Sequence, residues 1–126
     1  MRAVQYTFKR LAGHLRAELF GRQTLEETLE FVAALIAEAK KAAATRILVW
    51  VRNSRPLFKV EKHNVSERFR QLAAYRQVRV ALLADCDEVR ASHQYIEVLA
   101  GQQGANVRAF REEARALDWL GAQSQE

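Results

Sequence analysis

The chain has 126 residues, of which 49% are hydrophobic and 28% charged, a composition typical of one globular domain with a sizeable core. No apolar run approaches the roughly 20 residues that a membrane helix needs, and the first residues lack the apolar core of a secretory signal. The net charge of +5 permits an acidic partner, and the single cysteine excludes an internal disulfide and fits a cytoplasmic location.

Two short segments at the start of the chain alternate between apolar and polar residues. The alternation over residues 3–9, and again over 14–19, predicts two strands with one buried face each. Residues 10–13 supply the turn, and Gly21 ends the second strand. We therefore expect an antiparallel hairpin at one edge of a sheet.

A long helix is predicted next, over about residues 24–43. The sequence Thr-Leu-Glu-Glu at 24–27 forms a capping box, in which the side chains of Thr24 and Glu27 each accept from the other's backbone amide. The first turn is acidic, whereas Lys40 and Lys41 lie in the last turn, which is the order that the helix dipole favours. One face of this helix is apolar at helical spacing and comprises Leu25, Leu29, Val32, Leu35, Ile36 and Ala39.

Residues 47–51 are five apolar residues in a row between two arginines. So short an unbroken run predicts a strand that is buried on both faces, as in a parallel sheet. Its odd-numbered residues point to one face, and Leu48 and Trp50 point to the other. Both faces of this central strand therefore need cover, from the last helix, from another subunit or from an apolar ligand.

The second half of the chain repeats the alternation of helix and strand. Asn64 is the expected N-cap of a second helix, and the nearly continuous apolar run 78–84 predicts another strand. A third helix follows over about 89–100, with Gly101 or Gly104 as its end.

The chain closes with a strand over 106–110 and a short helix that opens at Glu112 and Glu113 and stops at Gly121. Residues 122–126 are expected to be a frayed tail. The order predicts a single α/β domain over 1–126, with a mixed five-stranded sheet and four helices. The sheet begins with the N-terminal antiparallel hairpin and continues with parallel strands, whose right-handed crossover helices lie on one face if successive strands are neighbours.

The second face of this sheet has only the short last helix to cover it. A helix of about ten residues spans roughly 15 Å, less than the width of five strands about 4.7 Å apart. The sequence therefore predicts an apolar patch used by a homodimer or by a lipophilic ligand. We favour the homodimer, because symmetric pairs are the commonest oligomers.

Features spread over nearly the whole chain resemble the SpoIIAA-like group of the STAS superfamily, including its STAS/CRAL-TRIO-like members. They are the hairpin ending in Gly21, the capping box with its long helix, the strand 46–51, and the closing segments 104–110 and 113–120. The resemblance implies a bacterial protein with a mixed sheet and helices mainly on one side. It also implies a role without catalysis, in regulation, partner docking or ligand sensing.

The resemblance also implies an alternative function at Ser54. Family members that antagonise anti-sigma factors carry a phosphorylatable serine in an Asp-x-Ser-Gly-type motif directly after the corresponding strand. Here Ser54 stands at about that place, without the aspartate or the glycine, and Pro56 follows. Flanking arginines would favour a phosphoserine electrostatically.

The loop after the central strand is the candidate binding site. It leaves the carboxyl edge of a strand and enters a helix N-terminus, the place where open α/β sheets bind ligands and anions. The plainer interpretation is a solvated loop without a ligand. Segment 52–70 carries six lysines and arginines against two acids. The candidate residues for an anionic or lipid-like ligand or a protein partner are Arg52, Asn53, Ser54, Arg55, Leu57, Phe58, Lys59 and Lys62.

A second loop, Ala84-Asp-Cys-Asp-Glu-Val89, resembles the nucleophile loop of haloacid-dehalogenase-type phosphatases and suggests a small hydrolase. That chemistry also needs a second acidic cluster and a lysine, and too few residues follow to supply them. The plainer interpretation is that Asp85 or Asp87 caps the third helix, with Glu88 in its first turn.

Other chemistry finds little support in the sequence. His14, His63 and His93 lack metal-site spacing, Ser54 has no neighbouring histidine, and Cys86 among carboxylates indicates an inert thiol. No helix carries a continuous basic face, which argues against nucleic acid. We therefore expect no enzyme, no cofactor and no metal, but a domain that binds or regulates.

Overall fold

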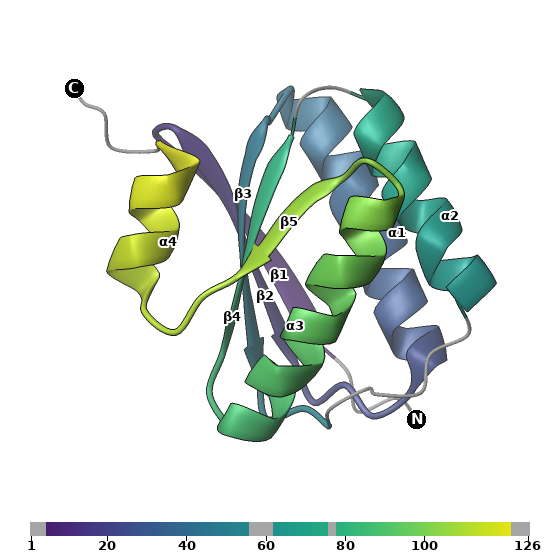
Figure 1. Cartoon of the computed structure of the whole chain (residues 1–126). Coiled ribbons are helices and arrows are strands. Elements are labelled where there is room, and N and C mark those ends of the chain that lie inside the picture. Colours follow the sequence, from purple (N-terminus) through teal and green to yellow (C-terminus); the bar gives the residue numbers. More distant parts are fainter. Residues whose placement is uncertain (1–4, 56–61, 76–77, 122–126) are drawn as a thin grey trace.

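The computed structural model of the chain describes residues 5–55, 62–75 and 78–121 (Figure 1). The order of its elements confirms the predicted single α/β domain with four helices and five strands. In chain order they are β1 (Gln5–Leu11), β2 (His14–Phe20), α1 (Leu25–Ala42), β3 (Arg46–Arg52), α2 (Lys62–Tyr75), β4 (Arg79–Ala84), α3 (Asp87–Gln102), β5 (Asn106–Ala109) and α4 (Glu113–Leu120).

The five strands form one mixed sheet in the order β1-β2-β3-β4-β5. The pair β1 and β2 is antiparallel, and the three pairs that follow are parallel, as predicted. The hairpin turn is shorter than expected, because Leu11 pairs with His14 and leaves only two residues between them. Gly13 has a φ of 86°, the left-handed conformation that glycine adopts without strain and that so tight a turn requires.

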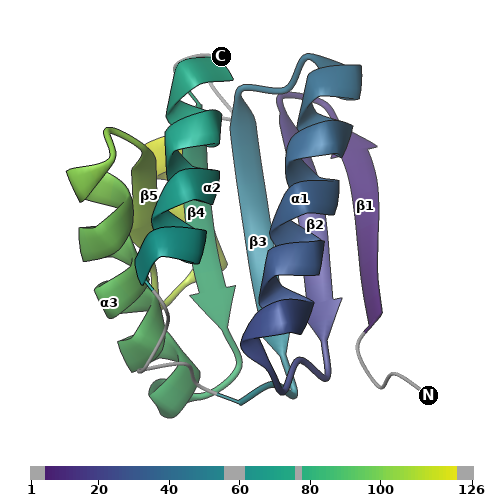
Figure 2. The same cartoon turned by 90° about the vertical axis from the view of Figure 1, so that its right-hand side faces the viewer.

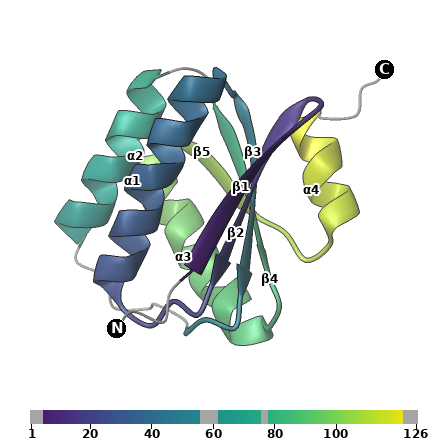
Figure 3. The same ribbon diagram turned by 180° about the vertical axis from the view of Figure 1, so that it is seen from behind.

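Helices α1, α2 and α3 cover one face of the sheet, and α4 lies alone on the other (Figures 1 and 3). Figure 2 shows the three helices in front of the strands. Right-handed crossovers between neighbouring parallel strands produce this arrangement. The main core lies between the sheet and these helices, and its buried members include Leu15, Leu19, Phe31, Ile47, Val80 and Val89.

A smaller core lies under α4, where Leu48 and Leu83 are buried against Ala116 and Leu120. This confirms that the side chains of β3 alternate between two covered faces. The second face over β1 and β2 is largely polar, with Thr7, Lys9, Arg16 and Glu18 lining a shallow hollow there together with Leu11. One short helix is therefore enough to cover the apolar part of the second face.

The broad apolar patch predicted for the second face is not found among the described residues, because α4 covers the apolar side chains of β3 and β4, and the side chains of β1 and β2 on this side are largely polar. Among the described residues, the large apolar side chains that remain exposed are Leu11 at 38% and Val98 at 58%. Leu11 ends β1 and Val98 lies on α3.

The helix starts show where local sequence rules hold. Thr24 caps α1 as predicted: its Oγ1 accepts from the Glu27 amide at 3.2 Å, and Glu27 Oε1 accepts from the Thr24 amide at 3.2 Å. Helix α2 begins at Lys62, so Asn64 lies inside its first turn and is not the cap. A cap is worth only about 1 kcal/mol, which extra helical residues offset.

The start of α3 also differs from the prediction. Its N-cap is Cys86, which makes no side-chain capping hydrogen bond, and neither Asp85 nor Asp87 caps the helix. Asp87 and Glu88 lie in the first turn instead, where the helix dipole favours acids. At the other end, Gly104 follows the helix with a φ of 81°, the conformation that ends helices.

None of the helices within the described ranges combines the length and apolar character that crossing a membrane requires. The predicted frayed tail, 122–126, falls outside the described residues.

Candidate functional site

The loops after β2, β3 and β4 meet at one edge of the sheet, where the arrowheads of these strands lie in Figure 2. An open basin of about 610 Å³ lies there. It brings together two loops that the sequence singled out separately. Its lining residues are Gly21, Gln23, Asn53, Ser54, Arg55, Asp85 and Cys86.

Ser54 holds the loop after β3 in place. Its hydroxyl donates to the carbonyl oxygen of Arg52 at 2.9 Å and accepts from the amide of Arg22 at 3.1 Å. The amide of Arg55 donates to the carbonyl oxygen of Arg22 at 2.9 Å. The loop after β3 is therefore tied to the loop after β2 at Ser54 and at Arg55.

Asp85 fixes the same loop from the side of β4. Its Oδ2 accepts from the amide of Asn53 at 2.9 Å, and Asn53 has a φ of 49°, a left-handed conformation that asparagine tolerates. The other acid of the predicted hydrolase loop, Asp87, pairs with Arg90 on the next turn of α3. Both carboxylates are thus engaged in structural contacts.

The side chain of Arg52 belongs to the second face and does not join the basin. Its guanidinium lies 4.2 Å from the centre of the Trp50 ring, and its Nε lies 3.8 Å from Glu18 Oε1. Trp50 Nε1 in turn donates to Glu113 Oε1 at 2.7 Å. That hydrogen bond, together with the charge of nearby Arg16, lowers the pKa of Glu113. The contacts of Glu113 with Trp50 and Arg16 therefore connect the start of α4 to β3 and β2.

Part of the predicted binding site cannot be placed. Leu57, Phe58 and Lys59 lie outside the described residues, and so does the side chain of Lys62, which opens α2. Of the eight predicted residues, the structure brings Asn53, Ser54 and Arg55 to the basin and turns the side chain of Arg52 away.

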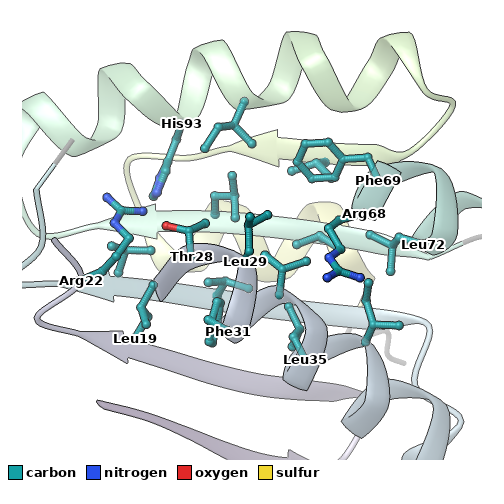
Figure 4. Close-up of a pocket in the computed structure, with 18 residues that line it drawn as sticks. Leu19, Arg22, Thr28, Leu29, Phe31, Leu35, Arg68, Phe69, Leu72 and His93 are labelled. Carbon is teal, nitrogen blue, oxygen red and sulfur yellow. The ribbon is translucent and has the colours of Figure 1, made fainter. Parts of the chain in front are cut away.

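A second hollow lies inside the main core, between the sheet and helices α1, α2 and α3. It has a volume of about 90 Å³. Its walls are mostly apolar side chains from strands and helices, among them Leu19, Phe31, Val49, Phe69, Val80 and Val107. Figure 4 shows four polar side chains in this wall: Arg22, Thr28 and His93 near one another, and Arg68 farther along.

Arg22 is the most unusual of these side chains, because it is an arginine with only 2% of its surface exposed. It donates from Nη2 to the carbonyl oxygen of Arg55, but within the described residues its Nε has no hydrogen-bond partner. No ion pair of Arg22 occurs among these residues either. Burial lowers the pKa of Arg22 to about 10, although the charge of Glu27 acts in the opposite direction.

His93 faces Arg22 from α3 and is equally buried, at 2% exposed. Burial lowers its pKa to about 3, and the positive charges of Arg22 and Arg90 lower it further. The ring is therefore neutral at physiological pH. It then offers one N–H donor and one acceptor nitrogen.

Sequence reasoning missed both residues, although a signal existed. His93 stands four residues after Val89 and three before Ile96, which places it on the apolar face predicted for the third helix. Arg22 lies between the end of a buried strand and the Thr24 cap, at the edge where ligands bind. An arginine between a strand with a buried face and a helix cap is therefore a candidate for a buried charged group.

Among the described residues no three histidine, cysteine, aspartate or glutamate side chains gather as a metal site. In comparisons with known proteins, no family model matches the chain, and no curated protein matches it significantly.

Proposed function

We propose that the chain is a non-enzymatic regulatory or binding domain of the SpoIIAA-like type, in which the loop after β3 docks a protein partner or senses a small anionic or lipophilic ligand. The architecture supports this, because a mixed sheet with helices mainly on one side is what the resemblance implies. We further propose a bacterial, cytoplasmic protein, in keeping with its single thiol, Cys86.

One observation carries the proposal: the basin's reactive groups hold the loop, while its exposed side chains remain for recognition. The Ser54 hydroxyl and the Asp85 carboxylate are both used in hydrogen bonds to the backbone. Asn53 and Arg55, by contrast, are exposed at the tip. A loop fixed in one shape loses little entropy on binding, which favours recognition.

Charge reversal at the loop tests this proposal. A hexaglutamate peptide or inorganic phosphate serves as the acidic probe, followed by NMR shifts of backbone amides. We expect the amides of Asn53 and Arg55 to shift, and Arg55→Glu to weaken binding at least about fivefold. Arg115→Glu on α4 is the matched control and should bind as the wild type does. Equal loss in both variants, or no shift near the basin, contradicts the proposal.

The rival class, a small hydrolase using the Asp85 and Asp87 loop, makes a different prediction. Such an enzyme would hydrolyse p-nitrophenyl phosphate, and Asp85→Asn would abolish turnover. We expect no turnover from either protein, because the Asp85 carboxylate accepts from a backbone amide and Asp87 pairs with Arg90.

Phosphorylation of Ser54 is a second candidate function. The observation in its favour is that Ser54 directly follows β3 and links two loops through its hydroxyl. A phosphate there would break the donation to Arg52 and release the loop. Incubation with cell lysate and ATP followed by intact mass should show one added phosphate, and Ser54→Ala should show none. Equal labelling of both proteins would show that Ser54 is not the phosphorylated residue.

A homodimer is the remaining partner within this proposal. Because the described part of the second face is polar over β1 and β2, such a dimer would rest on polar contacts. Light scattering at micromolar concentration should then show a dimer that salt weakens. A mass of 14.4 kDa, that of the monomer, at every concentration and salt level contradicts it.

A further inference from the structure

We propose that the hollow between the sheet and helices α1, α2 and α3 is a binding site for a small amphipathic carboxylic acid. Its carboxylate would pair with Arg22 and His93, and its short apolar tail would fill the rest of the space. This site goes beyond the loop function proposed above. It holds whether or not a partner docks at the loop.

Among the described residues, no carboxylate pairs with the guanidinium at the polar end of the hollow. A buried guanidinium is costly unless it is paired and fully hydrogen-bonded, yet Arg22 is 2% exposed and its Nε has no partner within the described chain. The nearby acid Glu27 does not fill this role. Its Oε1 accepts from the amides of Gln23 at 2.6 Å and Thr24 at 3.2 Å.

Three elements bring polar groups to this end. Figure 4 shows Arg22 from the loop after β2, Thr28 from α1 and His93 from α3 directing their polar ends toward one another. The planar guanidinium can donate two parallel hydrogen bonds to a carboxylate, and a neutral His93 can donate one more. A carboxylate at this point satisfies the orphaned Nε and adds the missing negative charge.

The remaining wall is apolar and sets the size of the tail. Leucine, valine, isoleucine and phenylalanine side chains line it, and a hollow lined in this way excludes water in favour of apolar groups. The volume of about 90 Å³ exceeds what one water needs but falls short of a benzene-binding cavity of about 150 Å³. We therefore infer a short-chain acid and exclude a long-chain fatty acid.

The charge balance favours a carboxylate over a phosphate. One buried cation neutralises one negative charge, and His93 remains neutral. A phosphate dianion would leave a second negative charge in an apolar enclosure, where an unpaired charge is strongly unfavourable. Arg68 also lines the hollow, but it is half-exposed and lies away from the polar end.

Calorimetric titration of the full chain with butyrate, with the neutral analogue 1-butanol and with inorganic phosphate tests the assignment. We expect butyrate to bind about ten- to a hundredfold more tightly than 1-butanol, the gain that charge-assisted hydrogen bonds provide. Phosphate should not compete. Extending the acid to decanoate should give no further gain, because the hollow is full.

Variants locate the carboxylate. Arg22→Met should lower butyrate affinity to that of 1-butanol, and Val32→Phe, which fills the hollow, should weaken both ligands. Arg68→Met is the matched control and should retain the preference for the acid. Should Arg22→Met fold poorly in thermal melts, Arg22→Lys, which keeps the charge, should retain part of the preference.

Four outcomes would overturn the proposal. They are equal binding of butyrate and 1-butanol, no binding of either, phosphate binding that Arg22→Met abolishes, and loss of preference in Arg68→Met but not in Arg22→Met. The loop variant Arg55→Glu shows whether the hollow and the loop proposed above bind independently. If it binds butyrate normally while failing to bind the acidic peptide, the two sites are separate.

Discussion

The ring of His93 lies on the inner face of α3, where burial and the cations Arg22 and Arg90 lower its pKa to about 3. In the unfolded chain a histidine titrates near 6.5. Between these two pH values the unfolded state binds a proton that the folded state does not, so the free energy of unfolding rises with pH. Stability from this residue is complete above about pH 6.5 and is lost on acidification toward pH 3.

We predict that acidification from pH 6 to pH 4 removes about 2 to 3 kcal/mol of unfolding free energy through His93, at about 1.4 kcal/mol per pH unit. Urea unfolding across this range measures the slope. His93→Gln should flatten it. His14→Gln is the matched control and should change it less, because His14, whose pKa burial also lowers, is only half-buried. Identical slopes in the wild type and His93→Gln contradict the assignment.

Ser54 supports a second residue-scale prediction, because its hydroxyl both donates to Arg52 and accepts from the amide of Arg22. Ser54→Ala removes both hydrogen bonds and should cost about 1 to 2 kcal/mol, since water can replace them in part. Asn53→Gly is the control: it keeps the backbone contacts and relieves a φ of 49°, so its stability should not fall. Chemical denaturation measures both, and an unchanged midpoint in Ser54→Ala means that the hydroxyl does not hold the loop.

At the scale of elements, α4 covers the part of the second face that β3 and β4 form. Leu120 is fully buried there against Leu48 and Leu83. Leu120→Ala should therefore lower the free energy of unfolding by about 2 to 5 kcal/mol through lost burial and a cavity. Leu117→Ala, at a half-buried position of the same helix, should cost clearly less. Equal losses in the two variants, measured by urea unfolding, would mean that α4 is not docked as described.

Most elements follow from the sequence because short-range patterns decide them. The capping box at Thr24 and the unbroken run 47–51 each placed an element within a residue or two. The start of α2 did not follow, because the helix begins two residues before Asn64, and one favourable N-cap residue does not by itself fix where a helix starts. The prediction that Asp85 caps the third helix was also wrong. Asp85 instead accepts from the amide of Asn53 in the neighbouring loop, a contact that no local sequence rule reveals.

The two candidate sites differ in the same way: local sequence patterns predict one of them, and only tertiary packing reveals the other. The loop after β3 was predictable, because a basic loop at the carboxyl edge of a strand is visible in sequence. The hollow was not, because it depends on which side chains three separate helices bring together. Arg22 and His93 are 71 positions apart and meet only when the loop after β2 and helix α3 reach the same end of the main core.

At the scale of the whole molecule, the buried charge of Arg22 lowers the free energy of unfolding but would bind the proposed carboxylic acid. Burial lowers the pKa of Arg22 to about 10, well below the usual value for arginine, and at neutral pH this corresponds to a cost on the order of 3 kcal/mol for keeping it charged. The hydrogen bond to the carbonyl oxygen of Arg55 recovers part of that cost. Replacing an unpaired buried charge with an apolar side chain of similar length removes the cost of taking that charge out of water.

We therefore predict that Arg22→Met raises the free energy of unfolding of the ligand-free chain by about 1 to 3 kcal/mol, seen as a higher urea midpoint with an unchanged slope. Saturating butyrate should narrow or reverse this difference, because it binds the wild type more tightly than the variant and stabilises each folded protein in proportion to that binding. Arg68→Met serves as the control and should change little in either condition. A clear loss of stability in ligand-free Arg22→Met would show that the guanidinium is held as a structural group, and a buried charge kept for a ligand would no longer explain its position.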